Sequence, residues 1–223
     1  MKVRVACASA SPASCRESYP PVRDNVGAII STAAYQYAEG NYLAGRSENG
    51  LTTTYSWGDC GEQLSKSSAA VTEYVYDARR TMTQVKVSGS SVANYEYDAL
   101  GRRIKTVEGG VTTITLYSGN DVVYEVETPP TGPATTTTYL ALNGQYLAKT
   151  VREGLDQPQT FFFHTDLVGS VRAVTDSTGQ LVARFEYEPF GLTTLASGAL
   201  ANETHKFTGK PEDGTGLYYF GAR

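Results

Sequence analysis

Apolar and polar residues alternate with a period of two along most of this chain, and pairs of aromatic residues mark the clearest alternations. Tyr95-Glu96-Tyr97 places two aromatic side chains on one face of an extended strand. The same pattern lies 21 residues earlier at Tyr74-Val75-Tyr76, and weaker copies recur at intervals of about 20 residues in both directions. A fixed period indicates a repeat architecture, in which each unit packs on its neighbours.

Each repeat is predicted to hold two strands and two turns. After the strand that ends at Tyr97, Asp98-Ala99-Leu100-Gly101 is typical of a type I turn. Residues 102–107 and 111–117 are rich in β-branched residues and predict two more strands, with a glycine turn between them. The pattern therefore predicts an all-β protein of stacked antiparallel β-hairpins that form a curved or spiral sheet.

The most regular side chains of the repeat are predicted to be structural. Tyrosines of neighbouring hairpins are expected to pack together, because cross-strand aromatic pairs contribute roughly 0.2–1 kcal/mol each. Aspartates and glycines that recur at the repeat period are expected to form turns and not a pair of catalytic carboxylates. These structural positions are Tyr74, Tyr76, Asp77, Tyr95, Tyr97, Asp98 and Gly101.

The chain divides into three predicted regions. Residues 1–34 show no repeat and are predicted to be a disordered leader, and residues 35–128 hold the hairpin repeats. A proline-rich stretch at 128–133 separates them from a β-meander over residues 129–223, where Asn143-Gly144 predicts a tight hairpin turn. One short helix is predicted around residues 195–201.

The repeat units resemble the YD repeats of the RHS (rearrangement hot spot) family, over about residues 35–223. FHTDLVGSVRAVTD at 163–176, GQLVARFEYEPFG at 179–191 and GTGLYYFGAR at 214–223 resemble the RHS-repeat-associated core. The residues that carry this resemblance are His164, Asp166, Gly169, Ser170, Arg172, Asp176, Gly179, Tyr187, Pro189, Phe190, Gly191, Gly216, Leu217, Tyr218, Tyr219 and Arg223.

The resemblance implies a structural wall segment of a polymorphic toxin. In the family, a long spiral of hairpins encloses a toxin, so the implied partners are the remaining shell segments of a longer chain or a cognate toxin cargo. The family's autocleavage segment and toxin follow a Tyr-Tyr-x-x-Ala-Arg run, and this sequence stops at Arg223, so we interpret it as a C-terminally truncated core. The family also implies a secreted or cell-envelope protein, although the N-terminus lacks the apolar run of a signal peptide.

Two alternatives remain at this stage. A cell-surface adhesion or carbohydrate-binding module is the alternative function, because exposed tyrosine rows stack on sugar rings. A β-propeller is the alternative architecture, because two such hairpins would make one blade of about 40 residues. In either stacked form, exposed strand edges predict self-association of the isolated chain.

Composition argues against several other classes of protein. A net charge of −4 and the lack of a basic run argue against a nucleic-acid partner, and the sequence has no apolar run of the ~20 residues needed for a membrane helix. Cys7, Cys15 and Cys60 lack the spacing of a zinc site and are expected to be isolated thiols.

No catalytic, cofactor or metal site is predicted, so the chain is not expected to be an enzyme. His164 and Asp166 lie two residues apart and are expected to make structural hydrogen bonds, because no nucleophile motif accompanies them. His205 is expected to be exposed and to bind no metal.

Overall fold

The structure, a computed structural model, describes residues 15–18, 22–23, 29–31, 33–142, 144–188 and 191–221 of the 223-residue chain. The chain forms two compact units. Unit 1 comprises Met1–Arg80 and Gln84–Ser91, and unit 2 comprises Thr81–Thr83 and Val92–Arg223. Two short 3-10 helices accompany the strands in the described residues, so the all-β prediction is confirmed.

Unit 1 is built from short antiparallel strands. β4 pairs with β1 and with β5, and β5 to β8 then pair in chain order, while β2 and β3 form a separate pair. The predicted leader therefore includes β1 to β3, and most of its other residues lie outside the described ranges. The elements are β1 (Cys15–Ser18), β2 (Val22–Arg23), β3 (Ile29–Ser31), β4 (Ala33–Tyr37), η1 (Glu39–Asn41), β5 (Leu43–Glu48), β6 (Leu51–Trp57), β7 (Gln63–Ser67) and β8 (Val71–Tyr76).

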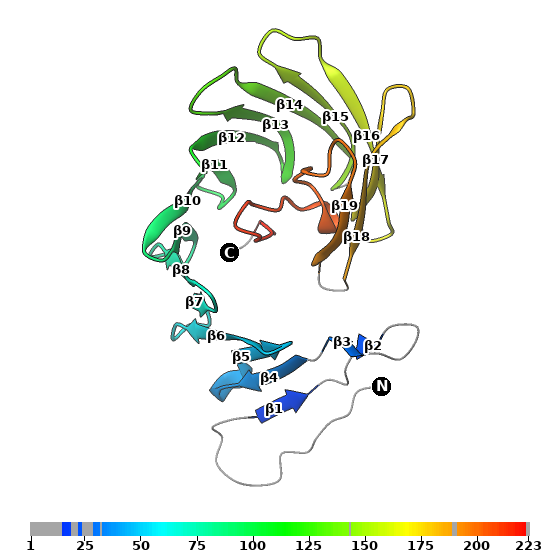
Figure 1. The fold of residues 1–223 in the computed structure, drawn as a ribbon. Coiled ribbons are helices and arrows are strands. Elements are labelled where there is room, and N and C mark those ends of the chain that lie inside the picture. Colours follow the sequence, from blue (N-terminus) through cyan, green and yellow to red (C-terminus); the bar gives the residue numbers. More distant parts are fainter. Residues whose placement is uncertain are drawn as a thin grey trace. The chain divides into compact units, whose positions relative to one another are not determined.

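Unit 2 is one antiparallel meander, in which each strand pairs with the next along the chain. Its strands curve, and the C-terminal residues lie on the concave side (Figure 1). The predicted curved sheet of hairpins is confirmed. The elements that follow β8 are β9 (Met82–Val87), β10 (Ser90–Tyr97), β11 (Arg103–Glu108), β12 (Val111–Ser118), β13 (Asp121–Thr128), β14 (Thr135–Leu142), β15 (Gln145–Glu153), β16 (Gln159–Thr165), β17 (Val171–Asp176), β18 (Leu181–Tyr187), β19 (Thr193–Ser197) and η2 (Phe207–Gly209), with β9 and β10 at the division between the units.

An aromatic side chain ties the open end of several hairpins. Tyr117, near the end of β12, donates its hydroxyl hydrogen to the Arg103 carbonyl at the start of β11, over 2.8 Å. Because the glycine turn joins the other ends of these two strands, the bond closes the hairpin at the end far from its turn. We call this contact the aromatic clamp, and it recurs at 2.7–2.9 Å from Tyr97 to Met82, Tyr76 to Gln63, Tyr187 to Val171 and Trp57 to Leu43.

The meander has one buried and one exposed face. In β18, Ala183 and Phe185 are 1% exposed, whereas Arg184 between them is exposed. This matches the alternation predicted for the strand, except that Leu181 at its start is exposed. The largest buried cluster of unit 2 consists of Val122, Tyr139, Tyr146, Phe161, Phe163, Val171, Val174, Ala183 and Phe185.

The predicted helix around residues 195–201 is wrong. Thr193–Ser197 forms β19, which pairs antiparallel with β18 and so satisfies backbone groups along the edge of that strand. Gly198 follows with a φ of +99°, a conformation that breaks a right-handed helix. Long-range strand pairing therefore outweighs the weak local preference for helix.

Candidate functional site

The aspartates and glycines of the predicted motifs form one recurrent turn. Asp98 Oδ1 accepts hydrogen bonds from the backbone N–H groups of Leu100 and Arg102, each over 2.9 Å. Gly101 donates its N–H to the Asp98 carbonyl and has a φ of +82°, which suits glycine. The same backbone bond is made by Gly169 to Asp166, Gly179 to Asp176, Gly191 to Glu188 and Gly216 to Asp213, each with a positive φ.

Arg80 takes the glycine position in the turn of Asp77. Its N–H donates to the Asp77 carbonyl over 2.9 Å, and its φ is +63°. A non-glycine residue in this left-handed region costs roughly 1–2 kcal/mol, because Cβ approaches the following carbonyl oxygen. This turn therefore carries local backbone strain that the other copies avoid.

His164 and Asp166 make separate hydrogen bonds. His164 Nε2 lies 3.0 Å from Thr175 Oγ1 on the exposed surface. Asp166 Oδ1 instead accepts the N–H groups of Val168 and Ser170 inside its turn. The hydrogen bond of His164 thus joins two neighbouring strands, and those of Asp166 stabilise a turn.

The other core-motif residues lie around β17, β18 and the C-terminus. Ser170 is 1% exposed, and the Arg172 guanidinium lies 5.6 Å from the centre of the Tyr187 ring. Tyr218 packs edge-on against Phe207. The Leu217 carbonyl accepts the Asp213 backbone N–H in the last turn. Of the repeat motif, Tyr74 on β8 is buried. Pro189, Phe190 and Arg223, and Asn143 of the predicted turn, lie outside the described residues.

Residues 198–221, called the C-terminal segment from here on, dock on the concave face of unit 2 (Figure 1). Two backbone hydrogen bonds join the segment to the sheet. Leu200 of the segment donates its N–H to the Val182 carbonyl, and the Lys206 carbonyl of the segment accepts the Val171 N–H. Ser170 Oγ accepts the Thr208 N–H over 3.0 Å. The buried Ser170 of the core motif is therefore a docking residue for this segment.

A buried ion pair joins the segment to the sheet, between Arg103 on β11 and Asp213. The two guanidinium N–H groups donate to the two carboxylate oxygens over 2.7 Å each, and both side chains are less than a tenth exposed. The rings of Tyr95 and Tyr219 lie 4.8 and 4.4 Å from the guanidinium carbon. Burial opposes the charge of Arg103, but the hydrogen bonds and charge of Asp213 outweigh it and raise the pKa of Arg103.

A second polar contact lies further along the segment. The Lys149 ammonium on β15 lies 2.6 Å from the Glu203 carboxylate, which also accepts a hydrogen bond from the backbone N–H of His205. The His205 ring is fully buried, 4.8 Å from the Tyr139 ring and 4.4 Å from the Tyr146 ring. The expectation that His205 is exposed is therefore wrong, because the segment folds back onto the sheet and not outward.

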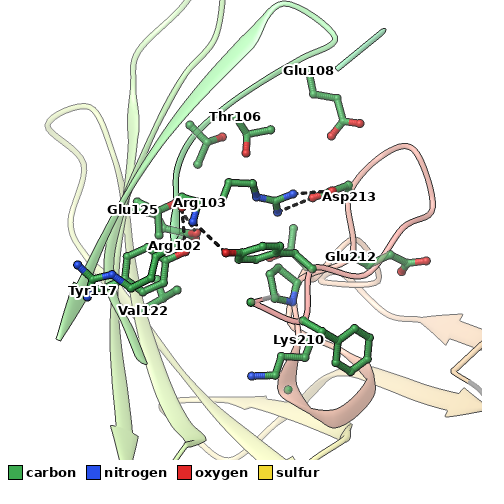
Figure 2. A pocket seen from close by; sticks show the side chains of 18 of the residues that line it. Arg102, Arg103, Thr106, Glu108, Tyr117, Val122, Glu125, Lys210, Glu212 and Asp213 are labelled. Atoms are coloured by element: carbon green, nitrogen blue, oxygen red, sulfur yellow. Dashed lines mark hydrogen bonds and ion pairs between the residues drawn. The ribbon is translucent and has the colours of Figure 1, made fainter. Parts of the chain in front are cut away.

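A cavity of about 530 Å³ lies between the inner face of the sheet and the C-terminal segment. Figure 2 shows Arg103 extending from the strands toward Asp213 on the facing loop, with Glu108 above it. Glu108 accepts the Gly214 N–H over 3.0 Å. The sheet side also contributes Thr106, Thr113, Thr115, Glu125 and Glu127, and the segment side contributes Lys210, Glu212 and Asp213.

Burial changes the acid–base behaviour of groups around the cavity. Desolvation is the main cause that raises the pKa of Glu127, with the nearby Glu125 charge adding to it. Desolvation also raises the pKa of Tyr146 to about 12. Both groups therefore favour their neutral forms more than they would in water.

This arrangement is suited to holding polypeptide in place. The Arg103–Asp213 and Lys149–Glu203 pairs and the ring contacts of His205 join the sheet to the segment. In the described residues, no group of three or more His, Cys, Asp or Glu side chains is placed to hold a metal ion. The described part also contains no helix that is long and apolar enough to cross a membrane.

The docking residues were not predicted from the sequence, apart from Ser170, Tyr95 and Tyr219. Arg103 and Asp213 lie 110 residues apart, so neither repeat period nor local spacing relates them. The sequence shows an acidic stretch at Glu212-Asp213, but it does not indicate which basic residue pairs with it. Nothing in the sequence indicated a docking role for Lys149 or Glu203, and Tyr139 was recognisable only as part of a weak copy of the repeat.

Comparisons with known proteins agree with this geometry. Residues 68–202 match the family model of the teneurin YD-shell. A tRNA3(Ser)-specific nuclease WapA of Bacillus spizizenii is 32% identical over 156 residues, which are 67% of this chain and 6% of that protein. The toxin subunit YenC1 of Yersinia entomophaga is 26% identical over 182 residues, which are 76% of this chain and 18% of that protein.

A solved structure shares the fold. The Tc holotoxin pore of Photorhabdus luminescens superimposes with a TM-score of 0.56 at 17% identity, over 90% of this chain and 14% of that chain. At this identity the similarity shows the fold alone. The chain thus spans a small part of the length of each of these proteins.

Proposed function

Because the chain belongs to the teneurin YD-shell family, we propose that it is a non-enzymatic wall segment of a β-shell that encloses a C-terminal polymorphic toxin. The observation that carries the proposal is the docked C-terminal segment, which the Arg103–Asp213 pair holds on the concave face of the sheet. A segment held on the inner side of a curved wall is the arrangement that a container needs, since it directs the polypeptide inward.

The relatives support this role in different degrees. YenC1 is a toxin subunit, which agrees with a shell segment of a toxin. WapA is a tRNA nuclease, but the match covers only 6% of it, so its activity does not transfer with the match. Arg103, Glu108 and Lys149 of the sheet all bind the docked segment, which favours the structural role.

The alternative of a sugar-binding module has less support. It requires exposed tyrosine rows, yet Tyr95 is 3% exposed and its hydroxyl donates to Asp213. Exchanging Tyr95 and Tyr97 for alanine would therefore disrupt the docking of the segment and would not be a clean test of glycan binding.

Protease protection tests the shell role. The complete reading frame that encodes this chain would be expressed and treated with protease under native conditions. We expect polypeptide beyond the wall to resist digestion, and we expect Asp213→Ala to make it accessible. Rapid digestion in the unaltered protein would overturn the proposal.

A nuclease assay tests the non-enzymatic part of the proposal. The purified 223-residue chain would be incubated with total tRNA and followed by gel. We expect the tRNA to remain intact at every protein concentration. Cleavage that is lost in His164→Gln or Asp166→Asn would show catalysis and contradict the proposal.

Self-association through strand edges stays a prediction for the isolated chain. Light scattering across a concentration series would measure it. We expect the average mass to rise with concentration. A constant monomer mass would contradict it.

A further inference from the structure

His205 is a buried titratable side chain that the shell role does not use. Its ring is 0% exposed and packs against the rings of Tyr139 on β14 and Tyr146 on β15, which also contact each other. Its Nδ1 lies 3.5 Å from Thr204 Oγ1, and its Nε2 has no hydrogen-bond partner among the described residues. The site is therefore shaped for an uncharged imidazole, since a protonated ring would need an acceptor for each N–H.

The charged groups around this ring are already committed. Glu203 is paired with Lys149 of β15, and Glu125 of β13 accepts the Tyr139 hydroxyl hydrogen over 2.8 Å. Lys149 and Lys210 both oppose a positive charge on the ring, whereas Glu125 and Glu203 favour it. Glu203 Oε1 lies 3.9 Å from His205 Nδ1, but this carboxylate is already paired with Lys149. Protonation of the ring would thus add a third cation beside Lys149 and Lys210.

We propose that His205 is an acid-sensitive latch, whose protonation loosens the C-terminal segment from the inner face and opens the cavity beside it. His205 lies within the C-terminal segment, two residues after Glu203, which pairs with Lys149 of the sheet. His205 also forms an antiparallel β-bridge with Pro211 inside the segment. Protonation of His205 would therefore affect both the Lys149–Glu203 contact with the sheet and the β-bridge inside the segment. The proposal depends on the docked segment alone and holds whether or not the wall encloses a toxin.

The direction of the effect follows from proton linkage. Burial is the largest cause that lowers the pKa of His205 below its ordinary value of 6.5. The His205 ring therefore binds a proton more readily in the undocked segment, where it is in water, than in the docked segment. Docking keeps its full strength above the undocked pKa and loses it as the pH falls below that value.

One proton sets an upper limit on the effect. When a proton binds only to the undocked state, the docking constant falls by at most about tenfold between pH 7.5 and pH 5.5. Glu127 acts in the opposite direction, because its raised pKa lets the docked state take up a proton on acidification. Its contribution can be removed with the variant Glu127→Gln, in which the decrease is expected to be at least as large as in the unaltered chain.

Hydrogen exchange of the full chain tests the proposal. Protection of peptides that span residues 198–221 would be measured at pH 7.5 and pH 5.5, with correction for the intrinsic pH dependence of exchange. We expect protection to fall toward the tenfold limit in the unaltered chain. We expect the decrease to be absent in His205→Gln, which cannot titrate, and to persist in His164→Gln, the matched change at the exposed histidine.

Three results would overturn the latch. They are unchanged protection in the unaltered chain, stronger protection at pH 5.5, or an equal decrease in His205→Gln. If His205→Gln fails to fold, the imidazole of the unaltered chain can be titrated by NMR. A ring that gains its proton at or above pH 6.5 while the segment stays docked would equally contradict the proposal.

Discussion

The guanidinium of Arg103 and the carboxylate of Asp213 form two parallel hydrogen bonds of 2.7 Å across the concave face of unit 2. Two tyrosine rings cover the guanidinium, so the pair is shielded from water and held in a single geometry. Such a pair joins a strand of the sheet to a segment that follows it by 110 residues. It is the contact on which the docking of the C-terminal segment most depends.

Asp213→Ala is expected to release the C-terminal segment. Removing one partner leaves a buried guanidinium unpaired, which costs roughly 3–5 kcal/mol. Hydrogen exchange of residues 198–221 and urea unfolding would measure the loss. Glu96→Ala is the control, because it removes an exposed partner of Lys105 and is expected to change stability by less than about 1 kcal/mol. Equal effects of the two changes would contradict the role of the buried pair.

Tyr117→Phe is expected to weaken a hairpin by removing its aromatic clamp. The change deletes the hydroxyl that donates to the Arg103 carbonyl and keeps the ring, so the expected loss is about 1 kcal/mol. Thermal unfolding followed by circular dichroism would measure it. Tyr124→Phe in β13 removes a hydroxyl that forms none of the clamp bonds and should have a smaller effect.

Arg80→Gly is expected to stabilise the turn of Asp77. Arg80 has a φ of +63°, and glycine adopts this conformation without the Cβ clash. The gain should be about 0.5–1 kcal/mol, since the greater freedom of glycine in the unfolded chain offsets part of it. Urea unfolding measures the gain, and Arg79→Gly, one residue earlier, should give none. A loss of stability in Arg80→Gly would show that its side chain matters more than its backbone.

The protein is expected to lose stability above pH 10. Desolvation raises the pKa of Tyr95, Tyr117 and Tyr187 above the ordinary value of 10, so the folded state favours their neutral hydroxyls. This stability is complete below pH 10 and is lost as the pH rises toward the folded-state pKa values. Melting temperatures from pH 8 to pH 11.5 would show the decrease, and Tyr117→Phe should make it shallower. A flat profile across this range would contradict the prediction.

Much of the fold followed from local chemistry in the sequence. The Tyr-x-Tyr alternation and the aspartate turns act within a few residues, so their pattern identified the hairpins, the turns at Asp77 and Asp98, and the family resemblance. The helix predicted around residues 195–201 failed because it depended on local preference alone, and pairing with β18 overrode it.

The sequence by itself determined the wall, because strand alternation and turn geometry are properties of neighbouring residues. Only the tertiary structure decided the inner face. Arg103 meets Asp213, and His205 packs against Tyr139 and Tyr146, because the C-terminal segment folds back over the curved sheet. Contacts between residues so far apart leave no periodic trace in the chain, which is why His205 was expected in solvent and lies in the interior.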